Sequence, residues 1–381
     1  MEALVLSCST GGGHNSAAKA IVQALQERHH KVTFFDPYSL KSTHFANVIG
    51  MTYIKFVQHT PDLFGKVYAL GDAYSRMQTK ISVPSPVYAV QNKTSKLLEN
   101  YISEHHFDVI ITTHLFCGEI LTRLKRKHVT LPPVYFVATD YTCSPFVAEV
   151  QADHFVIPAA DLEDTFAGYG IPKEKMLPFG IPTLAQFHED MAPDKAKRAV
   201  GLDPKKKYFL ISGGSIGVGD IYDTIDHLLT FILSHKEYEI LVLVGNNLHL
   251  YENLMINYQG VRVLHLIKPT DHVYYYMKAS EIFISKPGGL SSTEAAAAAI
   301  PYAIITPIPG CEDKNAAYFE QHGMAIWVKD VSQDLLPAIV RLQNPSEKEQ
   351  MIAADRANID PDAAGKLVEF IEKKKKNSDL N

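Results

Sequence analysis

The residues best suited to chemistry gather in one stretch, Lys286–Phe319, of this 381-residue sequence. An apolar run of strand length, residues 281–285, ends at a Pro-Gly-Gly turn, and Ser291 to Glu294 then open an alanine-rich helix. A glycine turn at a helix start presents unpaired backbone N–H groups, which bind phosphate oxygens. Glu294 has the right sign for the positive end of this helix and can accept hydrogen bonds from a diol. The pattern indicates a diphosphate cradle, and it is equally typical of an ordinary βαβ unit.

A second expected strand, residues 302–306, leads into a polar loop, residues 309–315. In α/β proteins, ligands bind at the carboxyl ends of parallel strands. The same unit could therefore supply polar groups for a sugar.

A histidine in a glycine-rich segment is the candidate for proton transfer. Residues 3–7 predict a strand, followed by the glycine-rich residues 9–15 and a helix from about Ser16. A histidine at a helix start has a pKa suited to accepting a hydroxyl proton, so His14 is a candidate base beside Gly12 and Gly13. The alternative is a surface or loop-capping histidine.

A dinucleotide site must be weighed at the same place. Gly11, Gly13 and Ser16 half-match the Gly-x-Gly-x-x-Gly pattern, and Asp36 ends the next strand, where a ribose-binding acid would lie. Serine replaces the third glycine, and a histidine stands inside the turn. These departures argue against nicotinamide binding.

Other polar groups follow expected strands directly. Residues 107–113 end at His114, and residues 134–139 end at Asp140 and Tyr141. We expect these groups at the ligand-binding edge of the first sheet. Asp140 could orient His14, hold an acceptor hydroxyl, or simply cap a turn.

A second glycine loop follows the strand at residues 208–212 and contains Gly213, Gly214, Ser215 and Gly217. Its backbone amides can hold an anionic phosphate. The alternative is a tight turn in a structural βαβ unit.

Composition limits the possible classes of protein. With 46% apolar and 21% charged residues and a net charge of −5, the chain is typical of a globular protein and gives no argument for a nucleic-acid partner. Four scattered cysteines form no CxxC pair, so we expect no zinc site, no disulfide framework and a reducing cytoplasm. We also expect neither a signal peptide nor a membrane span.

The segment at residues 39–100 differs from the rest, with seven basic and three acidic residues among interleaved aromatic side chains. Residues 46–57 carry apolar side chains at helical spacing. This composition suits a helix on an anionic membrane surface, and it equally suits an amphipathic helix packed on its own domain. The four lysines at 373–376 are read as a solvated tail or a second membrane contact.

Several of these motifs, taken together, resemble one family. KPGGLSSTEA with PIPGCEDKNAAY, preceded in order by STGGGHNSAAKAI, ITTH, TDY, FGIP and SGGSIGVGD, is similar to the inverting glycosyltransferases that make monogalactosyl- or glucosyl-diacylglycerol. The peptidoglycan N-acetylglucosaminyltransferase is a more distant relative. The sequence departs from the family at Cys311, which replaces a glutamine, and at Lys268-Pro269, which replace Gly-Phe.

The resemblance implies roles for the motif residues. It implies that His14 is the base or positions the acceptor, assisted by Asp140, and that Gly12, Gly13, His114 and Tyr141 lie on the acceptor side. The residues implied to bind a UDP-sugar donor are Gly213, Gly214, Ser215, Gly217, Thr270 through its backbone, Gly288, Gly289, Leu290, Ser291, Glu294 at the ribose, and Glu312 and Asn315 at the sugar. No metal or other cofactor is expected, in keeping with the lack of a compelling DxD motif.

The expected fold is α/β of the GT-B type, with two doubly wound Rossmann-like domains facing across a cleft. We expect an acceptor-binding, membrane-facing domain at residues 1–182, a linker with its flanking helix at 183–205 and a UDP-sugar-binding domain at 206–361. Residues 362–381 are expected to form a helix that crosses back to the first domain.

The implied function is inverting transfer of glucose or galactose from a UDP-sugar to diacylglycerol. It would take place on the inner face of the cell membrane, with which a cytoplasmic enzyme associates peripherally. Open alternatives are transfer to another lipid or a soluble acceptor, a UDP-sugar epimerase of the same fold, and a nucleotide-sugar sensor without turnover.

Overall fold

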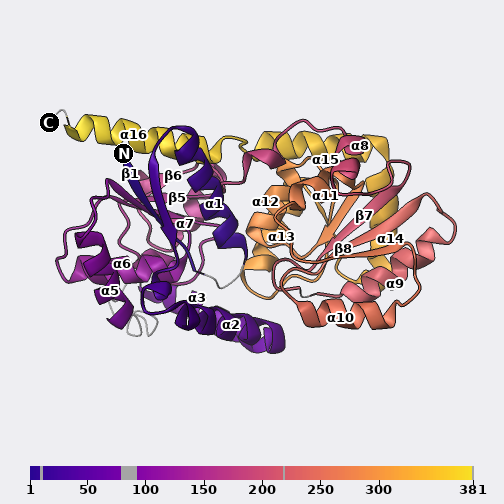
Figure 1. Ribbon diagram of the computed structural model, residues 1–381, viewed down its shortest axis with the longest axis horizontal. Coiled ribbons are helices and arrows are strands. Elements are labelled where there is room, and N and C mark those ends of the chain that lie inside the picture. The colour runs from indigo at the N-terminus through magenta and orange to yellow at the C-terminus, as the bar shows by residue number, and fades with distance from the viewer. Residues whose placement is uncertain (9–11, 79–91, 218, 380–381) are drawn as a thin grey trace. The chain divides into compact units, whose positions relative to one another are not determined.

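The computed structural model describes residues 1–8, 12–78, 92–217 and 219–379 (Figure 1). The chain folds into two compact units, which are Met1–Leu184 with Asp362–Asn381, and Ala185–Pro361. Part of the first glycine-rich segment (9–11), part of the basic segment (79–91) and Val218 lie outside the described residues.

Unit 1 is built on a parallel sheet of six strands in the order β2-β1-β3-β4-β5-β6. Strands β3 and β4 are buried along their whole length, because helices cover both faces of a parallel sheet. The strands are β1 (Glu2–Leu6), β2 (Lys31–Phe35), β3 (Val109–Thr112), β4 (Val134–Val137), β5 (His154–Val156) and β6 (Met176–Leu177).

The helices of unit 1 come from both ends of the chain. The last helix packs on the first, and its Leu367, Val368 and Ile371 join the same apolar core as Ile21 and Leu25. The α-helices are α1 (Gly12–Glu27), α2 (Thr43–His59), α3 (Pro61–Gln78), α5 (Asn92–Ser103), α6 (Leu115–Arg126), α7 (Glu163–Gly168) and α16 (Ala363–Asp379). Short 3₁₀ turns are η1 (Pro37–Leu40), η2 (Val147–Glu149), η3 (Ala160–Leu162) and η4 (Lys173–Lys175).

Unit 2 has a second parallel sheet of six strands, in the order β12-β11-β10-β7-β8-β9. The strands are β7 (Lys207–Ser212), β8 (Tyr238–Leu243), β9 (Leu264–Ile267), β10 (Ile282–Ser285), β11 (Tyr302–Ile304) and β12 (Ile326–Trp327). Around them lie η5 (Ala185–Phe187), α8 (Pro193–Ala199), α9 (Ile221–Ile232), α10 (Leu248–Asn257), α11 (Val273–Ala279), α12 (Gly289–Ala297), α13 (Cys311–Gln321), α14 (Val331–Gln343) and α15 (Pro345–Asn358).

In each sheet the direction of strand addition reverses once. The reversal lies between β1 and β3 in unit 1 and between β7 and β10 in unit 2. Leu6 pairs with Thr112, and Ser212 pairs with Ser285, so the two segments that follow each pair leave the sheet at the same level. Such a reversal opens a crevice at the carboxyl edge of a sheet, which is where doubly wound proteins bind ligands.

Some sequence-based boundaries were wrong. The segment read as a linker with its flanking helix (183–205) does contain a helix, α8, but α8 packs on α11, and from Ala185 onward the segment belongs to unit 2. Helix α1 begins at Gly12 rather than near Ser16, which places His14 inside its first turn.

The stretch 309–315, expected as a loop, enters α13 at Cys311. The Asp313 carboxylate accepts the Gly310 N–H at 3.1 Å and so caps this helix, a capping role that was not recognised in the polar run.

Among the residues described, no helix is both long enough and apolar enough to cross a membrane.

Candidate functional site

His14 is held by backbone and hydroxyl groups at the reversal point of unit 1. Its ring Nδ1 lies 2.7 Å from the Thr113 carbonyl oxygen, and the Thr113 hydroxyl donates to the His14 carbonyl at 2.9 Å. A carbonyl oxygen only accepts hydrogen bonds, so Nδ1 carries the hydrogen of the neutral ring. The lone pair is therefore on Nε2, which is the atom that can accept a proton.

The surroundings keep His14 neutral. Burial lowers the pKa of His14 from its usual value, while the Asp140 carboxylate and the bond to Thr113 act in the opposite direction. The Thr139 hydroxyl lies 3.0 Å from Nδ1. Two consecutive residues after β4 therefore act on this ring, Thr139 by contact and Asp140 through its charge. A neutral imidazole with a fixed tautomer is the form that a general base requires.

His114 is the second imidazole of this site. It is the N-cap of α6, and its Nδ1 accepts the Phe116 N–H at 3.1 Å, so in the neutral ring Nε2 carries the hydrogen. The rings of His14 and His114 lie 4.5 Å apart, nearly edge to face. Burial, and then the proximity of His14, hold the pKa of His114 well below its usual value. The site thus combines one imidazole that can accept a proton with one that can donate a hydrogen bond.

The remaining predicted residues of the acceptor side differ in accessibility. Gly12 and Gly13 form the start of α1 next to His14, and Asp140 is partly exposed. Tyr141 is buried within unit 1. Thr113 and Thr139 were not singled out from the sequence, although each directly precedes a residue that was, His114 and Asp140 respectively.

In unit 2, the turn after β7 packs closely on its neighbours. Gly214 and Gly217 have positive φ angles of 69° and 60°, where a side chain is strained. A Cβ on Gly217 would lie 2.6 Å from the Val244 carbonyl oxygen. The Ser215 carbonyl accepts the Asn246 N–H at 2.8 Å. The structure thus brings the turn after β7 against the end of β8.

The turn after β10 leads directly into a helix. Gly288 is the N-cap of α12, and Gly289, Leu290 and Ser291 are its first three residues. N–H groups in the first turn of a helix have no partner within it, so they point outward from the positive end of the helix. The Tyr302 hydroxyl donates to the Lys286 carbonyl at 3.2 Å, which fixes the start of this turn.

A buried ion pair lies between these two turns. The ammonium of Lys286 donates to Oε1 of Glu312, and Oε2 of Glu312 accepts the Ile308 N–H at 2.8 Å. Asn315 is fully buried, and its amide donates to the Pro287 carbonyl at 3.0 Å. Glu312 and Asn315, predicted as sugar ligands, are therefore bonded to the turn after β10. Lys286 received no role from the sequence, although its position directly after a buried strand was the available signal.

Glu294 lies in the second turn of α12, because the helix begins at Gly289. The interpretation that the helix dipole stabilises its charge was wrong, since that effect is confined to the first turn. Burial raises the pKa of Glu294 to about 8.

Thr270 follows β9, which β8 separates from β7, and its hydroxyl accepts the His272 N–H at 3.0 Å. The Thr270 hydroxyl is therefore engaged in a local turn. Thr270 also lies two strands away from β7, whereas the residues that follow β7 and β10 are neighbours.

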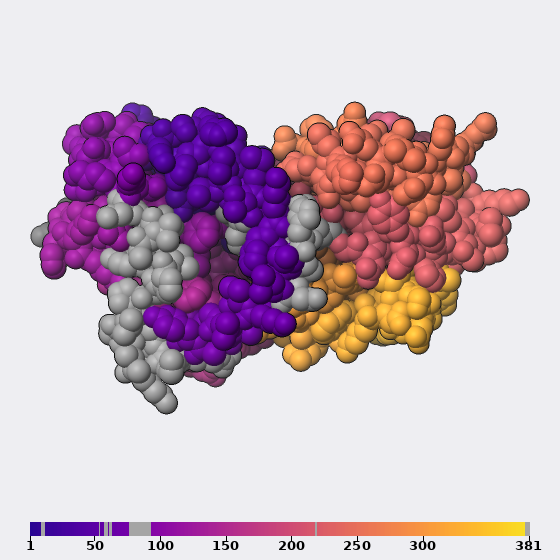
Figure 2. All heavy atoms as spheres, turned by 90° about the horizontal axis from the view of Figure 1, so that it is seen from below, coloured from indigo at the N-terminus to yellow at the C-terminus, as the bar shows by residue number. Residues whose placement is uncertain are grey.

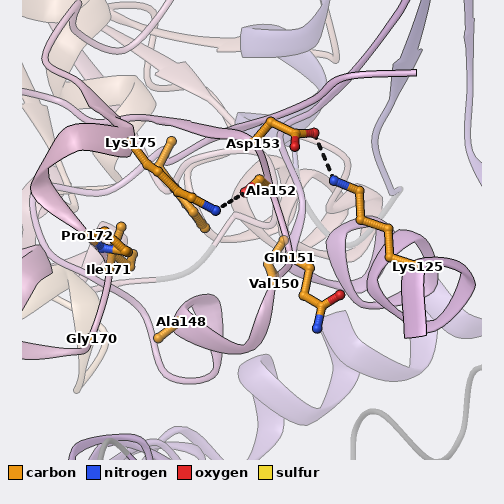
Figure 3. Close-up of a pocket in the computed structure, with 11 residues that line it drawn as sticks. Lys125, Ala148, Val150, Gln151, Ala152, Asp153, Gly170, Ile171, Pro172 and Lys175 are labelled. Atoms are coloured by element: carbon orange, nitrogen blue, oxygen red, sulfur yellow. Dashed lines mark hydrogen bonds and ion pairs between the residues drawn. The ribbon is translucent and has the colours of Figure 1, made fainter. Parts of the chain in front are cut away.

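A hollow of about 380 Å³ in unit 1 lies elsewhere (Figure 3). It is lined by Lys125 of α6, by residues before and at the start of β5 and by residues that precede β6, at the edge of the sheet opposite His14. Figure 3 shows its two lysines bonded to protein oxygens: Lys125 pairs with Asp153 at 2.8 Å, and Lys175 donates to the Ala152 carbonyl at 3.2 Å. None of the predicted site residues lines this hollow.

Within the described ranges, no three or more histidine, cysteine or acidic side chains cluster as metal ligands would. That the reaction needs no metal stays a prediction.

Comparison with known proteins identifies the family. Residues 14–183 match the family model for monogalactosyldiacylglycerol (MGDG) synthase, and residues 208–367 match the glycosyltransferase family 28 C-terminal domain. A processive diacylglycerol beta-glucosyltransferase of Bacillus cereus (strain 03BB102) is 25% identical over 378 residues, which cover 97% of this chain and 93% of that protein. The chain is a glycosyltransferase that combines an MGDG synthase domain with a family 28 C-terminal domain. It is a hexosyltransferase.

A second relative is a processive diacylglycerol beta-glucosyltransferase of Bacillus mycoides (strain KBAB4). It is 24% identical over 375 residues, which cover 97% of this chain and 93% of that protein. Solved structures share the fold of this chain. MurG of Acinetobacter baumannii superposes with a TM-score of 0.59 at 14% identity, covering 98% of this chain and 99% of the other.

The UDP-GlcNAc 2-epimerase of Neisseria meningitidis, bound to UDP-GlcNAc, gives a TM-score of 0.63 at 14% identity, covering 98% and 100%. The prediction of two Rossmann-like domains of the GT-B type is confirmed.

The protonation of His14 is directly measurable. Because the Asp140 carboxylate raises the pKa of His14 against a larger effect of burial, replacing Asp140 with Asn should lower that pKa further. An NMR titration of the imidazole carbons would show the His14 midpoint moving to lower pH, with the exposed His249 as an internal reference. A midpoint that rises or stays constant would contradict this electrostatic assignment.

Proposed function

We propose that this glycosyltransferase moves a hexose, glucose or galactose, from a UDP-sugar to diacylglycerol with inversion at the anomeric carbon. The observation that carries the proposal is the pair of reversal-point sites, one in each unit. Unit 1 presents an imidazole with its Nε2 lone pair available, and unit 2 presents a glycine turn beside the N-terminus of α12. The printed names of the relatives support diacylglycerol as the acceptor.

The proposed chemistry divides between the units. The acceptor hydroxyl gives its proton to Nε2 of His14 as its oxygen attacks the anomeric carbon, with the Asp140 carboxylate stabilising the imidazolium. The bond from the anomeric carbon to the diphosphate breaks, and its electron pair leaves with UDP. N–H groups at the start of α12 and in the turn after β7 stabilise the charge on the phosphate, so the step needs no metal ion.

The nucleotide would be fixed by Glu294 at the ribose hydroxyls. With a pKa of about 8, this carboxyl is protonated in much of the free protein near neutral pH. Two diol O–H groups donate best to a carboxylate, so donor binding is expected to favour the ionised form and to release a proton.

The proposed acceptor is a membrane lipid, and two helices of unit 1 offer a surface for it. On α2 and α3, which pack together, Val48, Met51, Leu63, Val67 and Leu70 are all exposed, Leu70 by 71%. These helices lie on the face of the molecule seen in Figure 2. Leu63, Val67 and Leu70 recur at i, i+4 and i+7, and Lys66 between them is also exposed. An apolar stripe with a nearby lysine suits an anionic membrane surface, such as the inner face of the cell membrane.

Activity tests the proposed function. UDP release from UDP-glucose or UDP-galactose should require diacylglycerol micelles, and the lipid should gain a hexose. His14→Ala should lower kcat by roughly 10²- to 10⁴-fold with little change in donor KM, because it removes the base and no donor contact. Glu294→Ala should instead raise donor KM about tenfold. The exposed His249→Ala serves as the matched control.

Each other outcome identifies an alternative. Release without lipid indicates hydrolysis or a soluble acceptor. Interconversion of UDP-sugars indicates an epimerase, and tight UDP binding without any product indicates a sensor. A His14→Ala variant as active as the wild type would remove the base assignment.

The membrane surface has its own test. Changing Leu63, Val67 and Leu70 to Ser should reduce co-sedimentation with anionic vesicles by about tenfold or more, since apolar area no longer leaves water on docking. The matched control changes Leu248, Met255 and Ile256, exposed apolar residues of α10, to Ser. Equal losses in both variants, or none in the first, would contradict docking through α3.

A further inference from the structure

Lys286 is buried at a place where a charge is costly. Its side chain is 10% exposed and that of Glu312 is 8% exposed. Removing two charges from water is costly, and a single ion pair seldom recovers this cost. A lysine held this way by one carboxylate contributes little to stability, which suggests a role other than stabilising the fold.

The position of the ammonium is defined by the two glycine turns. Ser212 and Ser285 are register partners at the ends of adjacent strands, so Gly213 and Lys286 directly follow these strands. A Cβ on Gly214 would lie 2.8 Å from Cε and 3.3 Å from Nζ of Lys286, and one on Gly288 would lie 3.6 Å from Nζ. The ammonium therefore lies between the turn after β7 and the turn that begins α12, within reach of any anion bound by both.

The Lys286 ammonium can donate further hydrogen bonds, and its partner Glu312 is held by a second hydrogen bond of its own. An ammonium has three N–H donors. Among the described residues, Nζ of Lys286 donates a hydrogen bond to Oε1 of Glu312. Glu312 is kept in place by the Ile308 N–H at its other oxygen. The carboxylate can therefore remain anchored on α13 when the ammonium turns toward another anion.

We propose that Lys286 is the cation that binds the diphosphate of the donor, and that Glu312 is its partner while the site is empty. This inference rests on the proposed function and adds to it a residue and a sequence of events. On binding, the diphosphate competes with Glu312 for the ammonium, and the freed Oε1 becomes available to a hydroxyl of the sugar. Recognition of the sugar by Glu312 thus follows occupancy of the phosphate site.

Binding of UDP and of uridine, measured by calorimetry, tests the charge. Lys286→Met should weaken UDP binding about tenfold or more and leave uridine binding within about twofold, because uridine lacks the diphosphate. Its UDP affinity should also depend less on salt concentration than that of the wild type. Lys286→Arg should retain the preference for UDP over uridine.

Glu312→Gln tests the competition. Since the amide binds the ammonium more weakly than the carboxylate does, UDP affinity should rise about threefold or more in this variant. Unchanged or weaker UDP affinity would overturn the exchange of partners.

Lys286→Met leaves a buried carboxylate without its cation and can unfold the protein. The double variant Lys286→Met with Glu312→Gln removes both charges, and it should show the same loss of UDP affinity with a melting temperature near that of the wild type.

The outcomes separate this inference from the proposed function. A wild type that does not bind UDP overturns both. A wild type that binds UDP, with a folded Lys286→Met or double variant that binds it equally well, overturns the role of Lys286 alone. Equal fractional losses for UDP and uridine would show a damaged site rather than a missing charge, and would also overturn it.

Discussion

The pairing of two strands at each point of reversal is the constraint on which both candidate sites depend. In a parallel sheet every strand ends at the same edge, and register decides which residues emerge together. Leu6 with Thr112 brings His14 next to Thr113 and His114, and Ser212 with Ser285 brings the turn after β7 next to Lys286. Segments about 100 residues apart in unit 1, and about 70 apart in unit 2, thus become neighbours without any contact specific to a ligand.

The two sites carry opposite chemistry, and each uses backbone groups to achieve it. In unit 1, the Thr113 carbonyl fixes the tautomer of His14, while burial keeps both imidazoles neutral. In unit 2, helix N–H groups and one lysine provide positive charge for an anion. A proton acceptor and a leaving-group site on separate units are the two components that sugar transfer to a hydroxyl requires.

Much of the fold could be predicted, because buried parallel strands are short apolar runs that end at glycine or polar residues. The strands at 208–212 and 281–285 and the two glycine turns were recognised in this way. The start of α13 was missed, because Cys-Glu-Asp-Lys-Asn is as polar as a loop. Its capping residue, Asp313, lies inside the helix and accepts the N–H of Gly310, three residues earlier. The pairing of Lys286 with Glu312 was also missed, because 26 residues separate them and only the folded chain shows that both are buried.

The most direct test of this account is a crystal structure with UDP bound. The diphosphate should lie between Gly213–Gly217 and the first turn of α12, with the ribose hydroxyls at Glu294. UDP bound instead in unit 1, at the glycines before His14, would contradict the account, because the nucleotide would then occupy the place assigned to the acceptor.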